Sequence, residues 1–159
     1  MKAWQVMAGS ALVASVLAAG AAEAQNWTYV VCSLETHFTV RDPSGVSDQG
    51  RSPARFTYRF NGSDFDIYSG GAISWRSQCT PDEEFPSSSC TINAENVISR
   101  RSRTTPGAVA RHDVIINRLT GGIVIHNITD IPSTSTSFRH ESSGSCEPTT
   151  DPTAGQRRF

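Results

Sequence analysis

Few residues of this sequence could carry out chemistry, and they form no recognisable catalytic group. His37 and His126 lie within segments that alternate between apolar and polar residues, which predicts places on strand faces rather than roles as ligands or bases. His112 is followed by Asp113, which could orient it as a base, but neighbouring residues of a strand point to opposite faces. The nucleophile motif Gly-x-Ser-x-Gly does not occur. We therefore expect no catalytic residue.

The four cysteines predict two disulfides. An even number of cysteines in an exported chain is typical of a disulfide framework, and four cysteines allow three pairings. We favour Cys79–Cys90, because the segment between them contains two prolines and a run of serines, which return the chain on itself. Cys32–Cys146 would then join the first strand to the last segment.

The sequence predicts neither a metal site nor a cofactor. No cysteine has a second cysteine or a histidine at the close spacing of zinc ligands. Asp64 and Asp66 share one face of a predicted strand, but their segment lacks the ligand order of a calcium loop. A solvated hairpin end accounts for these two carboxylates.

Two short charged clusters are the candidates for contact with a partner. They are an acidic cluster, Asp82, Glu83 and Glu84, and a basic cluster, Arg100, Arg101 and Arg103. Both lie in or beside predicted loops, where charged residues are common. Three arginines are too few for a nucleic-acid site, which also needs exposed aromatic side chains beside them. Because the net charge is only −1, we expect no nucleic-acid partner.

The N-terminal segment predicts export. Lys2 supplies a positive charge, an uncharged stretch rich in Ala and Val follows, and Ala22-Glu23-Ala24 has the small-x-small pattern of a cleavage site. We expect residues 1–24 to be a cleaved signal peptide and the product to be periplasmic or secreted. Lys2 is the only lysine, and all the other basic residues are arginines, which favours a GC-rich bacterial source. No later segment has the apolar length of a transmembrane span, so we expect none after cleavage.

The rest of the chain alternates with a period of two, which predicts strands. The clearest strand covers 55–60, where three aromatic residues share one face. Asn61-Gly62 follows, a dipeptide that favours a type I′ turn, and Phe65 and Ile67 continue the alternation on a return strand.

Further strands complete an all-β prediction. The apolar segments 113–119 and 123–128 predict a second, central hairpin, 101–110 predicts a polar loop, and 91–101 fits a strand or a helix. Six to nine short strands in one domain predict a single small antiparallel β-sandwich or a partly open β-barrel, braced by two disulfides. This domain would cover residues 25–146 as a monomer, and residues 147–159 would form a mobile tail.

Two segments carry a resemblance. The pattern Trp27-x-x-x-x-Cys32 and the segment 114–121 (VIINRLTG) resemble short exported bacterial β-proteins that mostly have no assigned function. Size, export and disulfides are also similar to periplasmic lysozyme inhibitors of the small β-barrel type. Ser69-Gly70-Gly71 matches part of their inhibitory loop but lacks the residues that follow it. Neither resemblance assigns a role to a residue.

The sequence thus favours a non-enzymatic exported β-domain that binds a protein or another component of the cell envelope. Its contact would be an exposed edge strand or the loop 79–90. One alternative is an inhibitor of an extracellular hydrolase, with the rigid loop 79–90 in the active site of its target. The other alternative is an enzyme with an unrecognised site. A concave pocket with converging polar groups around His112, His126 or Asp113 would favour that enzyme over the binding module.

Overall fold

The structure is a computed structural model and describes residues 26–47 and 50–154. These residues form ten β-strands and one short 3₁₀ helix. In chain order the elements are β1 (Thr28–Asp42), β2 (Gly45–Ser47), β3 (Arg51–Phe60), β4 (Phe65–Ser69), β5 (Ser74–Ser77), β6 (Ser87–Ile92), β7 (Asn96–Thr105), β8 (Ala108–Asn117), β9 (Gly122–Ile131), η1 (Pro132–Thr134) and β10 (Thr136–Pro148).

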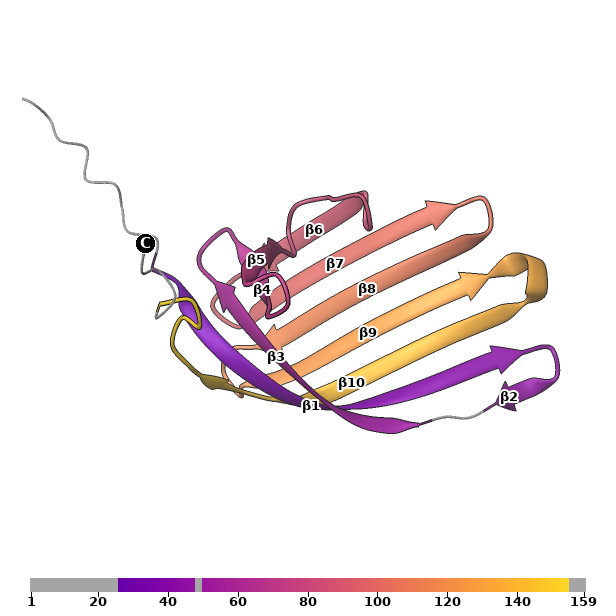
Figure 1. The fold of residues 1–159 in the computed structure, drawn as a ribbon, viewed down its shortest axis with the longest axis horizontal. Helices are drawn as coiled ribbons and strands as arrows, with labels where there is room; N and C mark the ends of the chain where they lie inside the picture. Colours follow the sequence, from indigo (N-terminus) through magenta and orange to yellow (C-terminus); the bar gives the residue numbers. More distant parts are fainter. Residues whose placement is uncertain (1–25, 48–49, 155–159) are drawn as a thin grey trace, which may run out of the picture.

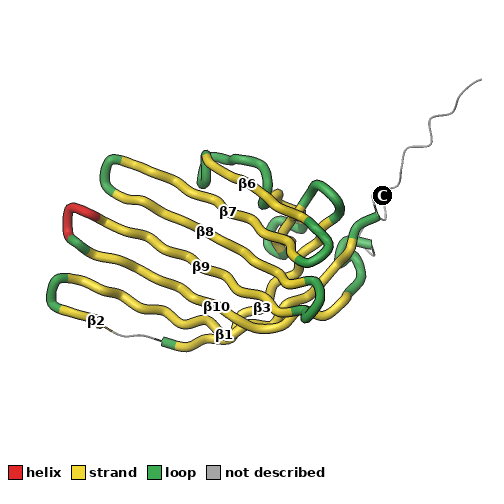
Figure 2. The backbone as a smooth tube through the Cα atoms, turned by 180° about the vertical axis from the view of Figure 1, so that it is seen from behind, coloured by secondary structure: helices red, strands yellow, loops and turns green. Residues whose placement is uncertain are grey.

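The strands form one antiparallel sheet that curls into a half-barrel (Figures 1 and 2). Its strand order is β5-β4-β3-β1-β10-β9-β8-β7-β6, and β2 pairs with β1. The expected all-β fold is confirmed in its partly open barrel form. The expected second hairpin is also confirmed, since β8 and β9 pair and neither lies at an edge of the sheet.

Alternation along the strands divides the sheet into an inner and an outer face. The inner face of one end of the half-barrel holds the core, whose largest fully buried side chains are Tyr58 and Phe65. The rest of the buried apolar set comes from five strands: Val30, Cys32, Leu34, Phe60, Val97, Val114, Ile116, Ile123 and Ile125. The aromatic face that the sequence predicts for 55–60 is therefore the face that enters the core.

Both expected disulfides form. Cys32 and Cys146 lie opposite each other on the paired strands β1 and β10. Cys79, just after β5, bonds Cys90 on β6. Since β5 and β6 are the two ends of the strand order, this second disulfide joins the two edges of the sheet and closes the barrel at that end. At the other end the strands extend past this closure as an open, curved sheet (Figure 1).

The predicted two-residue turn at Asn61-Gly62 is wrong. Phe60 and Phe65 form the last strand pair, so the loop contains four residues, and Gly62 does not have a positive φ. The Asn61 carbonyl Oδ1 instead accepts hydrogen bonds from the backbone N–H groups of Ser63 and Asp64, at 2.8 and 2.7 Å. The side chain of Asn61 thus takes over the role that a left-handed glycine would have.

The predicted loop over 101–110 is also wrong. Strand β7 continues to Thr105 and β8 begins at Ala108, so only the Pro106-Gly107 turn remains between them. The ambiguous segment 91–101 spans a turn after Ile92 and the first part of β7. These strands were hard to predict because they are rich in charged and small residues: beyond Arg101, no second layer formed by the described residues covers this part of the sheet. The strand count consequently exceeds the expected six to nine.

The C-terminal residues continue beyond the expected domain boundary at 146. Strand β10 ends at Pro148, and the N–H of Thr149 donates to the carbonyl oxygen of Tyr29 at 2.9 Å. The hydroxyl of Tyr29 also donates to Asp151. The expected signal peptide and residues 155–159 lie outside the described residues. Among the described residues, no helix has the length and apolarity needed to span a membrane.

Candidate functional site

The predicted contact residues separate onto three parts of the fold. Asp82, Glu83 and Glu84 lie in the loop between β5 and β6, and Arg100, Arg101 and Arg103 lie on β7. Because residues of a strand alternate, Arg101 and Arg103 share the inner face while Arg100 lies on the outer face. The structure brings Arg101, Asp82 and Glu84 together at the mouth of the closed part of the barrel. It leaves Arg100, Arg103 and Glu83 outside this cluster.

Arg101 is the central residue of the mouth. It is only 3% exposed, and its Nη2 donates to Asp82 Oδ2 at 2.5 Å. Its guanidinium also lies over the ring of Phe85, 4.6 Å from the centroid. The Arg101 Nε has no hydrogen-bond partner among the described residues. A buried arginine needs such partners, because an unpaired charge in a protein interior costs several kcal/mol.

Arg76 is a member that sequence reasoning missed. Its Nη2 donates to Asp82 Oδ2 at 2.8 Å and to Glu84 Oε2 at 2.6 Å, so it faces both acids of the loop. These hydrogen bonds raise the pKa of Arg76 above its ordinary value. Its position at the end of a strand, six and eight residues before the two acids, was a signal available in the sequence. Two residues of the acidic cluster, Asp82 and Glu84, therefore pair with arginines, and Arg101 is the member of the basic cluster that joins them.

Asp82 organises the loop that covers the mouth. Its Oδ1 accepts the N–H of Phe85 at 2.8 Å, and its own N–H donates to the Phe85 carbonyl at 3.1 Å. The hydrogen bond from the Phe85 N–H to the carboxylate, with those from Arg76 and Arg101, holds the pKa of Asp82 well below its ordinary value. The loop therefore folds back over the barrel, with Phe85 turned toward the mouth.

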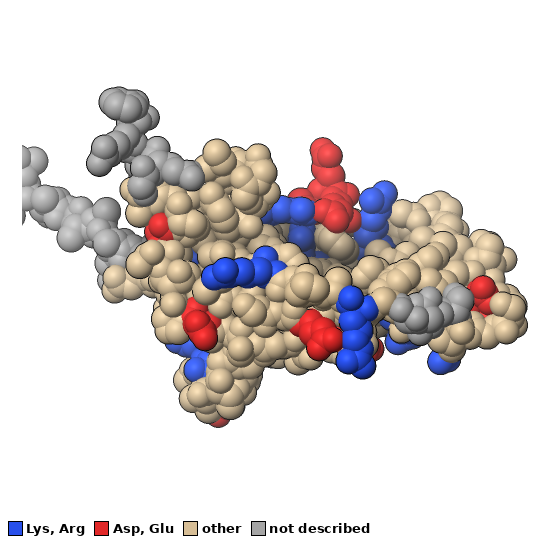
Figure 3. Space-filling model, turned by 60° about the horizontal axis from the view of Figure 1, so that its bottom comes forward, with Lys and Arg blue, Asp and Glu red and all other residues tan. Residues whose placement is uncertain are grey.

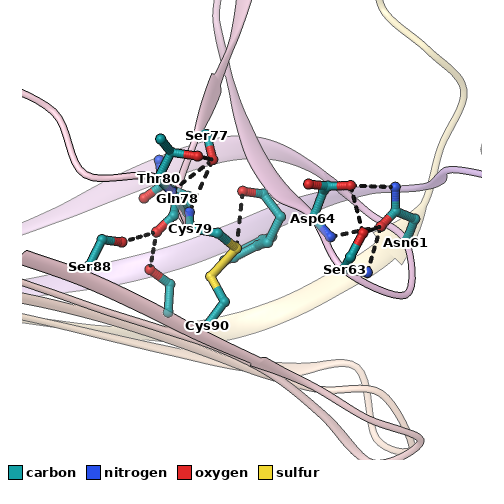
Figure 4. Close-up of a disulfide and its surroundings, with 11 residues drawn as sticks. Asn61, Ser63, Asp64, Ser77, Gln78, Cys79, Thr80, Ser88 and Cys90 are labelled. Atoms are coloured by element: carbon teal, nitrogen blue, oxygen red, sulfur yellow. Dashed lines mark hydrogen bonds between the residues drawn. A yellow bond between two sulfur atoms is a disulfide. The ribbon is translucent and has the colours of Figure 1, made fainter.

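The base of this loop is also fixed to the sheet (Figure 4). The carbonyl oxygen of Gln78 accepts the hydroxyls of Ser88 at 2.9 Å and Ser99 at 2.8 Å, next to the Cys79–Cys90 disulfide. Gln78 and Ser99 are both buried. Loop 79–90 is thus held by a covalent bond, an ion-pair cluster and buried hydrogen bonds.

His112 lies beside Arg101 on the inner face. It is directly opposite Asn127 on β9, and its Nδ1 hydrogen-bonds to the Asn127 Oδ1. Burial lowers the pKa of His112 below its ordinary value, and the nearby charge of Arg101 lowers it further. The ring of Phe85 lies 5.9 Å from the His112 ring. His112 is therefore held as a neutral imidazole near pH 7.

A hollow of about 200 Å³ opens between these side chains. It is lined by Ile67, Arg76, Gln78, Glu84, Phe85, Arg101, His112 and Asn127. Figure 3 shows one face of the molecule, on which acidic and basic side chains stand next to one another rather than in separate patches of one sign. The hollow therefore has both polar and apolar lining side chains and no large net charge, because its arginines pair with Asp82 and Glu84.

The inner face continues from the hollow along the open end. In register across the strands, Arg101 is followed by His112, Asn127, His140 and Phe38. We call these five residues the cross-strand row. Phe38 and Asn127 are half-buried and His140 is exposed. Within the described part of the chain, no strand or helix lies over this surface (Figures 1 and 2).

No protein-family model matches the chain, and no curated protein matches its sequence.

Proposed function

We propose that this chain is a non-enzymatic binding module of the cell envelope, with its ligand on the inner face of the open end. One observation carries the proposal. At the closed end, the inner face of the sheet is the buried core. Along the same strands this face becomes half-exposed beyond the hydrogen bond between Thr36 and Ser142. A folded domain gains stability by covering such a face, so leaving it open is a cost that a ligand would remove.

The disulfides support an envelope location. Two disulfides are typical of proteins that work in an oxidising compartment. The export signal expected over residues 1–24 points to the same place.

An enzyme is the second candidate, because the hollow around His112 is concave and its polar groups converge. A neutral imidazole oriented by an amide could act as a general base. The other groups, however, pair with one another: Arg76 and Arg101 with Asp82, and Arg76 with Glu84. No hydroxyl or thiol of the described residues shares a hydrogen bond with His112. Binding therefore accounts for more of the site than catalysis does.

The inhibitor alternative rests on loop 79–90, which is braced as such a loop must be. Two of its side chains, Asp82 and Phe85, are directed at the barrel mouth rather than away from it. That orientation is typical of a loop that covers the protein's own hollow. An inhibitory loop would direct such side chains outward, into the active site of its target.

Retention of a component from the native envelope tests the proposal. We expect the immobilised chain to retain one component stoichiometrically, and His140→Ala on the inner face to lose it. His126→Ala is the matched control, because His126 lies on the outer face, on the neighbouring register pair with Glu141. Equal retention by both variants would place the ligand elsewhere. Turnover of that component that His112→Gln abolishes would establish the enzyme instead.

A further inference from the structure

We infer that the ligand is an uncharged glycan chain, laid across the strands with one sugar in the hollow and its neighbours along the cross-strand row. This inference rests on the proposed function and names its ligand class. It follows from the lining of the hollow, the rings beside it, the direction of the row and the closure of the sheet edges.

The hollow offers many hydrogen-bonding groups without net charge. Planar polar side chains, Gln78, Asn127 and His112, line it together with the paired charges of Arg101 and Glu84. Because the two arginines are matched by two carboxylates, an anionic or cationic ligand gains little here. A sugar carries hydroxyls that both donate and accept, and so fits a rim of mixed donors and acceptors.

An aromatic platform adjoins this polar hollow. The rings of Phe38 and Phe138 lie nearly parallel, with 19° between their planes and 6.5 Å between centroids. The His140 ring lies 4.4 Å from Phe38. Both phenylalanines are half-buried on the open inner face. The C–H face of a sugar ring packs on such rings, since aromatic side chains combine apolar area with a fixed geometry.

The direction of the row fits a chain rather than one small molecule. The row covers five adjacent strands, from Arg101 on β7 to Phe38 on β1. Neighbouring strands lie about 4.8 Å apart, which is close to the advance of an extended glycan per sugar. Successive sugars can therefore meet His112, Asn127, His140 and Phe38 in turn, while the buried Arg101 closes the end of the row.

The sheet edges argue against an added peptide strand. The disulfide Cys79–Cys90 and the hydrogen bonds to Gln78 join the two edges at the closed end. Strand β6 pairs with β7 as far as Ser102, so on this edge only the short segment 103–105 of β7 has no strand paired beside it. Such a segment offers few main-chain hydrogen bonds to a peptide.

Calorimetric titration of the full chain with six-sugar oligomers tests the inference. The probes are cellohexaose, chitohexaose and maltohexaose, with hexagalacturonate as the acidic counterpart. We expect one neutral oligomer to bind, more tightly than its own monosaccharide because the row is long. Phe38→Ala and Asn127→Ala should each weaken binding by about tenfold or more, as expected for truncated anchor side chains. The outer-face control His126→Ala should leave the affinity unchanged.

A second measurement does not depend on how the variants fold. On addition of the oligomer, backbone amide shifts should change along β1, β8, β9 and β10 and in loop 79–90, and not at the outer aromatic residues Tyr68 and Trp75. Absence of binding by every neutral oligomer, or tighter binding of hexagalacturonate, overturns the glycan inference. If the envelope component is still retained through His140 in that case, the binding function stands and only its ligand class is wrong. If neither experiment shows binding, both proposals fail.

Discussion

The guanidinium of Arg101 and the carboxylate of Asp82 meet at 2.5 Å and join strand β7 to the loop that covers the barrel mouth. Only 2% of the Arg101 side chain is exposed, against 32% for Asp82. The two partners are therefore unequal: Asp82 also contacts Arg76 and solvent, whereas Asp82 is the only ion-pair partner of Arg101 among the described residues.

This inequality predicts the order of two substitutions. Asp82→Ala leaves the buried guanidinium of Arg101 without an ion-pair partner. It should therefore lower the free energy of unfolding by about 3 kcal/mol, as for other broken buried pairs. Arg101→Met leaves Asp82 with Arg76 and water and should cost less. Urea unfolding measures both, with Arg103→Met as the control on the same face of β7; an exposed arginine should change stability by less than about 0.5 kcal/mol. A larger loss for Arg101→Met would contradict the account.

The lowered pKa of His112 predicts an acid-sensitive stability. The unfolded chain takes up a proton near the ordinary histidine pKa of about 6.5, whereas the folded chain resists it to lower pH. The stabilisation is therefore complete above pH 6.5 and declines as the pH falls from there toward the folded pKa. His112→Gln should remove this part of the slope between pH 7.5 and 5.5, measured by denaturant unfolding. An unchanged slope would mean that His112 titrates alike in both states.

Loss of one disulfide or the other should affect different parts of the sheet, as seen in amide hydrogen exchange. Cys79 and Cys90 join the two edges of the sheet, whereas Cys32 and Cys146 join strands that are already paired. Cys79→Ser with Cys90→Ser should cost about 3 kcal/mol by the chain-entropy model and speed amide hydrogen exchange in β4 to β6 while β8 and β9 stay protected. The matched control is Cys32→Ser with Cys146→Ser, in which exchange should not rise selectively in β4 to β6. The same local increase in both double variants would show that the edge-joining role is wrong.

At Gly144, strand β10 lies so close to β1 that there is no room for a side chain. A Cβ at this position would lie 2.0 Å from the backbone oxygen of Ser33, which cannot move without breaking the strand pair. Gly144→Ala should therefore destabilise the fold by about 3 kcal/mol or more, at the upper end of the cost of overpacking. Gly107→Ala is the control, since a Cβ there meets nothing within 4 Å. Thermal unfolding compares them, and equal midpoints would remove the steric argument.

Local chemistry determined much of the fold from the sequence alone. The alternation over 55–60 and the apolar segments of β8 and β9 specify strands and their faces, because a strand presents every second residue to the same side. The turn-forming segment between Cys79 and Cys90 brings those two cysteines together for a similar, local reason. The four-residue loop after Phe60 escaped prediction because the Asn61 side chain, rather than a positive φ at Gly62, closes it.

Only the tertiary structure decided the site. His112 meets Asn127, and Arg101 meets Asp82, through the register of neighbouring strands and the curl that brings β5 back to β6. Alternation shows which residues share a face, but the closure of the sheet decides whether that face is buried or open. The same curl buries Arg101 at the mouth and leaves Phe38 half-exposed three strands beyond His112. The sequence thus singled out Arg101, Asp82 and His112 but not Arg76, because the meeting of these residues depended on contacts between distant segments.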